Sequence, residues 1–166
     1  MNRNLTIFLD LEETLIDDWR HGNWLSNQTD AILSLIQTRM IEINPFETSL
    51  GLMSWAVENF DDKLSFMRRF SHTIENHFDL KFQSHNVLSV SDWRIMINRI
   101  SGINFSNDDF NDFATKENVL FWLRNAHESI LPEGFIILVD DTVSHLDKIV
   151  TEKRVIEFIN PKQLTT

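Results

Sequence analysis

The amino-acid sequence predicts an α/β domain built on a doubly wound parallel β-sheet. Short apolar segments of strand length alternate along the chain with segments of helical periodicity, which is typical of βαβ units. Two of the apolar segments also end abruptly in carboxylates, as expected at the ligand-binding edge of such a sheet. The 166 residues include 4 Gly and 3 Pro, with no linker-like stretch. We therefore expect a single domain over residues 1–166.

The expected strands are short apolar runs, continuous enough to be buried on both faces of a parallel sheet. The first is Leu-Thr-Ile-Phe-Leu at Leu5–Leu9, and it stops at Asp10. Three later runs are of the same kind, at residues 49–55, 135–139 and 155–159. A weaker candidate covers residues 86–90.

The expected helices show apolar residues at three- and four-residue steps. In residues 26–41, for example, Ile32, Ile36 and Met40 lie on one stripe. Residues 141–150 are expected to begin a helix directly after their strand. The remaining helical segments are residues 61–78, residues 93–100, a segment around residues 108–113, and residues 117–127.

Composition excludes several classes of function. The chain carries 25 Asp and Glu against 15 Lys and Arg, a formal net charge of −10. Such a surface repels phosphate backbones and acidic membranes, so long nucleic acid is not an expected partner, but it suits divalent cations. The absence of cysteine excludes disulfides, thiolate metal sites and a cysteine nucleophile. No segment has the length of a signal peptide or a membrane span, so the expected location is the cytoplasm.

Carboxylates follow two of the expected strands. Asp10, Glu12 and Glu13 come after the first, and Asp140 and Asp141 come after the strand at residues 135–139. Because the carboxyl ends of parallel strands meet at one edge, these side chains can form an all-oxygen pocket of the kind that binds Mg²⁺. Alternatively, each group caps the following helix or faces water. If the groups do meet, their mutual repulsion requires a cation.

The order of these residues resembles the motif pattern of the haloacid dehalogenase (HAD) superfamily. Its first motif, an apolar strand followed by Asp-x-Asp-x-Thr, is similar to Asp10-Leu-Glu12-Glu-Thr14, with Glu12 in place of the usual second Asp. The later motifs are a Ser or Thr closing the next strand, a Lys opening a helix, and an acidic pair ending a strand. They are matched in order by Ser54, Lys116 and Asp140-Asp141. The resemblance covers residues 5 to 141 and implies a HAD-like, Rossmannoid sheet.

The resemblance further implies a magnesium-dependent phosphatase that acts through an aspartyl-phosphate. Asp10 would then be the nucleophile and Glu12 the general acid–base. Ser54 would hydrogen-bond a phosphoryl oxygen, and Lys116 would neutralise charge on the nucleophile and the phosphate.

Magnesium is the cofactor implied by the same resemblance, because it cancels the repulsion between a carboxylate and a phosphate. Its expected ligands are Asp10, the backbone carbonyl of Glu12, and one or both of Asp140 and Asp141. For the motifs to converge, the strand ending at Asp10 must lie between those ending near Ser54 and Asp140. The Asp10 and Asp141 carboxyl groups should then lie less than about 10 Å apart.

The chain leaves little room for the cap that selects substrates in this superfamily. Residues 15–25 suffice for a hairpin flap, and about 25 residues separate the weak strand candidate from Lys116. A capless or minimally capped fold is therefore expected, with an open site for a small phosphorylated substrate or the end of a macromolecule. Trp19 and Trp24 on the flap can stack on a flat leaving group or pack the flap onto the domain. Arg68 and Arg69 can grip a phosphate or lie on a solvated helix face.

Two other classes of function stay open. A catalytically silent HAD-like module that binds a protein partner or a phosphorylated ligand is favoured by the Glu12-Glu13 pair and the absent cap. The intact Asp10, Lys116 and acidic pair favour the enzyme. A receiver-like phosphoacceptor domain also combines an acidic pocket with a Lys, but it carries the phosphoacceptor on a later strand, which fits this order less well.

Overall fold

The computed structural model describes residues 2–104, 106, 108–109 and 131–164. The sheet in this part of the chain has six strands in the order β3-β2-β1-β4-β6-β5. All neighbouring strands run parallel except β5, which pairs antiparallel with β6. The strands are β1 (Leu5–Leu9), β2 (Thr48–Met53), β3 (Phe82–Leu88), β4 (Gly134–Val139), β5 (Lys148–Val150) and β6 (Arg154–Ile159).

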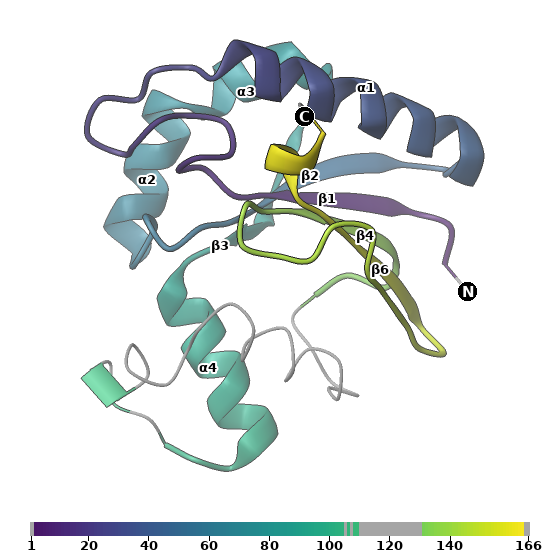
Figure 1. Ribbon diagram of the computed structural model, residues 1–166. Helices are drawn as coiled ribbons and strands as arrows, with labels where there is room; N and C mark the ends of the chain where they lie inside the picture. Colours follow the sequence, from purple (N-terminus) through teal and green to yellow (C-terminus); the bar gives the residue numbers. More distant parts are fainter. Residues whose placement is uncertain (1, 105, 107, 110–130, 165–166) are drawn as a thin grey trace.

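Helices cover both faces of this sheet (Figure 1). On one face lie α1 (Ser26–Ile43), α2 (Phe60–Arg69) and α3 (Ser71–Phe78), and on the other lies α4 (Val90–Ser101). A short 3₁₀ helix, η1 (Pro161–Gln163), follows β6. The predicted α/β class is therefore confirmed, and the sheet is parallel as predicted except for the antiparallel edge strand β5.

The two faces have separate apolar cores because side chains alternate along each strand. In β1, Leu5, Ile7 and Leu9 pack into the core beneath α1, α2 and α3. Phe8 points the other way, into the core that contains Trp93 of α4. All of β1 is buried, as predicted from its uninterrupted apolar run.

The helix expected over residues 61–78 is two helices. The break falls at Phe70, whose backbone leaves the helical region with φ −127°. Sequence periodicity conceals this break because Phe66, Phe70, Ile74 and Phe78 continue a four-residue apolar step across it, and all four are buried. The Ser71 hydroxyl donates to the Met67 carbonyl across the break.

The helix expected over residues 141–150 is wrong. An Asp140 carboxylate oxygen accepts the Thr142 backbone N–H and hydroxyl at 2.8 and 2.7 Å, which closes a turn instead of a helical start. Leu146 then takes a left-handed conformation with φ 62°. The β-branched Ile149 and Val150 pair with β6 as the edge strand β5.

The weak strand candidate lies at the end of β3, which begins four residues earlier than expected, and Val90 already belongs to α4. Most of the helical segment around residues 108–113, and all of that at residues 117–127, lies outside the described residues. The stretch between the weak strand candidate and Lys116, where a cap would be inserted, is partly described, and its described part contains α4, which packs on the sheet. None of the helices in the described part of the chain is long and apolar enough to span a membrane.

Candidate active site

The candidate site lies where β2, β1 and β4 end, at neighbouring positions in the sheet. Asp10 follows β1, Ser54 follows β2 and Asp140 follows β4, so the strand ending at Asp10 lies between the other two, as predicted. The Asp10 N–H donates to the Val139 carbonyl at 3.0 Å, which extends the strand pairing up to the carboxylate itself. The three side chains lie at the carboxyl ends of adjacent strands and are almost fully buried.

Three carboxylates converge at this edge. Asp10, Asp140 and Asp141 each offer an oxygen, and these oxygens lie within 4.8 Å of one another. Oxygens that share a Mg²⁺ ion at about 2.1 Å lie up to about 4.2 Å apart, so the cluster needs only a small adjustment to hold one ion. The donor set is all oxygen, as Mg²⁺ prefers. The expected proximity of Asp10 and Asp141 is confirmed.

Hydroxyl and amide donors orient two of these carboxylates. The Thr14 hydroxyl donates to Asp10 at 3.0 Å from the turn that follows β1. Thr142 donates twice to Asp140 from the turn that follows β4. Each threonine lies in the turn directly after its strand, close in sequence to the aspartate that it contacts. These local turns therefore fix the orientation of the two carboxylates.

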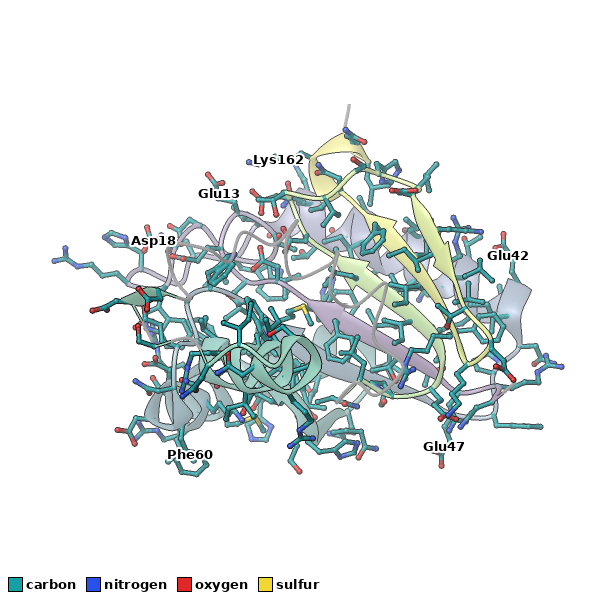
Figure 2. All side chains as sticks on the ribbon, turned by 90° about the horizontal axis from the view of Figure 1, so that it is seen from below. Glu13, Asp18, Glu42, Glu47, Phe60 and Lys162 are labelled. Carbon is teal, nitrogen blue, oxygen red and sulfur yellow. The ribbon has the colours of Figure 1, made fainter. Side chains whose placement is uncertain are left out.

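Lys162 is the basic residue that the sequence analysis missed. Its Nζ lies 3.4 Å from an Asp141 oxygen and 3.2 Å from a Glu13 oxygen, and Figure 2 shows Lys162 and Glu13 next to each other. It reaches the site from η1, after the carboxyl end of β6. The available signal was weak: Asn160-Pro161 stops the β6 strand at the functional edge of the sheet and places Lys162 there.

The acidic cluster shifts the ionisation of its members. Burial, followed by the charge of Asp140, raises the pKa of Asp141 above its ordinary value, and Lys162 opposes this shift. The hydrogen bond from Lys162 lowers the pKa of Glu13, and the same bond raises the pKa of Lys162. Desolvated, mutually repelling carboxylates of this kind are typical of cation-binding and catalytic sites.

Glu12 lies at the mouth of the site, in the turn between β1 and a hairpin formed by residues 16–24. One of its carboxylate oxygens accepts the Trp19 backbone N–H at 2.8 Å. The turn is closed by the Leu15 and Ile16 N–H groups, which both donate to the Leu11 carbonyl. The general acid–base expected from the motif is therefore tied to the hairpin.

The hairpin packs onto the domain. Trp19 lies against Phe70, with ring centroids 5.5 Å apart, and Trp24 lies edge-on to His77 at 5.3 Å. Both Trp side chains are partly buried against the core beneath α1, α2 and α3. Of the two roles considered for these tryptophans, the structure shows packing.

The Asp17, Asp18 and His21 side chains form a second group of metal-ligand type within the hairpin. Asp17 accepts bonds from the Asn23 backbone and side chain, and Asp18 from the His21 backbone and ring. The bond to Asp18 raises the pKa of His21, and bonds from neighbouring backbone amides lower the pKa of both aspartates. These bonds close the hairpin and account for the clustering.

The site opens into a pocket of about 380 Å³, within the size range of small-ligand sites. Its lining includes Asp10, Glu12, Ser54 and Asp141, four of the predicted site residues, together with Glu13, Asp17, Asp18, Trp55 and Thr142. Ser54 accepts the Ala56 backbone N–H at 3.3 Å. Lys116, the predicted basic residue, lies outside the described residues. Among the residues that line the described pocket, none is Lys or Arg.

No family model, curated protein or solved structure gives a significant match.

Proposed function

We propose that the chain is a magnesium-dependent phosphatase of the HAD type that hydrolyses a phosphomonoester through an aspartyl-phosphate on Asp10. The observation that carries this proposal is the convergence of the Asp10, Asp140 and Asp141 carboxylates within 4.8 Å at the ends of neighbouring strands. Ser54 and Glu12 line the same pocket as Asp10, which is the placement that the motif order requires.

Asp10, Asp140 and Asp141 would hold Mg²⁺, with the Glu12 backbone carbonyl as the fourth protein ligand inferred from the motif. When bound, the ion neutralises the negative charge that a carboxylate and a phosphate bring together. Three clustered carboxylates favour the binding of such an ion, because each negative charge destabilises the ionised form of the other two.

The chain's own residues supply the remaining chemistry. An Asp10 oxygen attacks phosphorus, a new P–O bond forms, and the bond to the leaving oxygen breaks as Glu12 gives that oxygen a proton. Glu12, now a carboxylate, takes a proton from water while the water oxygen attacks phosphorus. The P–O bond to Asp10 breaks, which releases phosphate and restores both carboxyl groups.

Positive charge and hydrogen-bond donors steady the phosphoryl group in this scheme. Ser54 lies directly after β2, and its hydroxyl would donate a hydrogen bond to a phosphoryl oxygen. Lys116 keeps its proposed charge-neutralising role from the motif. Lys162 adds a cation that already pairs with Asp141 and Glu13, so it limits repulsion within the acidic cluster before a substrate arrives.

The pocket and the charge of the chain restrict the substrate. A volume of about 380 Å³ accommodates a small phosphomonoester or the phosphorylated end of a larger molecule. The formal charge of −10 opposes long nucleic acid.

One observation favours a second candidate, the catalytically silent HAD-like module that binds a phosphorylated ligand or a protein. One oxygen of the Glu12 carboxylate accepts the Trp19 N–H at 2.8 Å, so only its other oxygen is available to a leaving group. A module in which that second oxygen did not reach the leaving group would bind Mg²⁺ and phosphate without turnover.

The two candidates are separated by phosphate release from aryl phosphates, nucleotides and sugar phosphates, each measured with Mg²⁺ and with EDTA. For the enzyme, Asp10→Asn abolishes turnover because it removes the nucleophile's charge and keeps its shape. Glu12→Asp retains part of the activity. A wild-type protein that binds Mg²⁺ but releases no more phosphate than its EDTA control across this panel is the silent module.

A further inference from the structure

The hairpin is held on α2 by a side chain that the proposed reaction does not otherwise use. The guanidinium carbon of Arg69 lies 4.8 Å from the centre of the Trp19 ring and 4.5 Å from that of Phe70. An Arg69 nitrogen also donates to the Trp19 carbonyl at 2.6 Å. Cation–π contacts and a charge-assisted hydrogen bond therefore join the hairpin to the helix at the same point.

Gly22 brings the other side of the hairpin against the same helix end. Its φ of +67° belongs to the left-handed region, and a Cβ there would lie 2.9 Å from Cε1 of Phe70. Only glycine allows both this backbone conformation and this close approach. The hairpin is thus docked on α2 by Arg69 and Gly22, with the Phe70 ring as the shared surface.

Trp19 connects this docking to the reaction chemistry through its two backbone groups. Its carbonyl accepts from Arg69 at 2.6 Å, and its N–H donates to the Glu12 carboxylate at 2.8 Å. A displacement of the hairpin from α2 therefore moves the donor that orients Glu12. Rates of general acid–base catalysis fall steeply with misplacement on the scale of about 1 Å.

We propose that Arg69 is a positioning residue for the Glu12 acid–base, acting by clamping the hairpin so that the Trp19 N–H holds the Glu12 carboxylate at the mouth of the site. This inference rests on the proposed function for the role of Glu12. The clamp itself rests on the contacts between Arg69, Trp19 and Glu12.

The clamp is tested first by amide hydrogen exchange, which requires no turnover. The protein is labelled with ¹⁵N-tryptophan, and exchange of the Trp19 amide is compared in the wild type, Arg69→Ala, Arg69→Lys and Arg68→Ala. Arg68 is the matched control because it is exposed on the same helix and its side chain makes no hydrogen bond or ion pair with the described residues. We expect Arg69→Ala to speed exchange of the Trp19 amide about fivefold or more, because loss of the cation–π contacts makes opening of the hairpin easier by about that factor. Arg69→Lys should be intermediate, and Arg68→Ala unchanged.

The positioning role is tested by leaving-group dependence, which a purely structural role would not alter. Protonation by Glu12 matters most when the leaving phenol is weakly acidic. We therefore expect Arg69→Ala to lower kcat/KM, which reports the steps up to departure of the phenol, at least about tenfold on phenyl phosphate but only about threefold or less on 4-nitrophenyl phosphate. These losses are part of the factor that general acid catalysis supplies. Glu12→Gln should show the same bias more strongly, and Arg68→Ala should match the wild type.

The outcomes separate the two proposals. Equal losses on both esters in Arg69→Ala, or a Trp19 amide that exchanges at the wild-type rate, overturn the inference while the phosphatase stands. A wild-type protein without turnover overturns the proposed function and the acid–base role together, and the exchange rates then decide the clamp alone. Faster exchange together with biased loss on phenyl phosphate supports the inference.

Discussion

Magnesium should stabilise the folded chain, and the stabilisation should depend on Asp140 and Asp141. The oxygens of Asp10, Asp140 and Asp141 lie within 4.8 Å of one another. Two unit charges at that distance repel by about 3.5 kcal/mol at an effective dielectric constant of about 20. Lys162 offsets part of this repulsion through its contact with Asp141. A divalent ion removes the rest only in the folded state, because the unfolded chain does not bring the carboxylates together.

The size of the effect follows from mass action. At a hundredfold excess of Mg²⁺ over its dissociation constant, the folded state gains about 2.7 kcal/mol. For a domain of 166 residues, each kcal/mol raises the Tm by about 2–4 °C, so the expected rise is about 5–11 °C. The assay is a thermal melt followed by circular dichroism across a Mg²⁺ series, with each variant also melted in EDTA.

The variant is Asp140→Asn/Asp141→Asn, which keeps the side-chain shapes and removes two of the three clustered charges. Its melting temperature should be insensitive to Mg²⁺. The matched control, Asp30→Asn/Asp61→Asn, removes two charges from exposed helical positions and should retain the full rise. A Mg²⁺-dependent rise of equal size in both double variants would refute a specific site and leave only surface screening.

Three further predictions concern the surroundings of the site. Lys162→Met should lower the Kd for Mg²⁺ about two- to fivefold in calorimetry, because the partly exposed Lys162 ammonium competes with the ion for the Asp141 carboxylate. A higher Kd would contradict this. Gly22→Ala should destabilise the fold by about 1–2 kcal/mol more than Gly102→Ala in urea denaturation, because both need positive φ but only Gly22 abuts a side chain; equal losses would contradict the packing. The pKa of His21, raised by Asp18, should fall toward 6.5 in Asp18→Asn when followed by NMR. The ion pair therefore stabilises the hairpin below pH 6.5 and loses that effect as the pH rises through the raised pKa; an unchanged pKa would exclude the contact in solution.

The sequence predicted the sheet edge well because its signals are local. An apolar run that stops at a carboxylate marks both a buried strand and the end at which ligands bind, and this identified Asp10 and Asp140. Parallel pairing then brought them together without further information. The turn closed by Thr142 was missed because Asp-Asp-Thr after a strand equally suits a helix cap, and the side-chain bond that decides between them forms only in the fold.

Long-range contacts explain what could not be predicted. Lys162 pairs with Glu13, 149 positions away in sequence, and no local pattern encodes that pairing. The bond from Arg69 to Trp19 spans 50 positions and depends on where helix α2 ends. That end is set by the break at Phe70, which apolar periodicity does not reveal.

Asp10 should carry a phosphoryl group during turnover, and the mass of its peptide tests this directly. The Glu12→Gln protein is mixed with an aryl phosphate and Mg²⁺, quenched in acid, digested and analysed by mass spectrometry beside Asp10→Asn/Glu12→Gln. Because Gln cannot activate water, we expect a phosphoryl adduct to accumulate on Asp10 and to be absent in the double variant and in EDTA. A peptide that stays unmodified in a protein shown to bind Mg²⁺, or a phosphoryl group found on another residue, would contradict the claim.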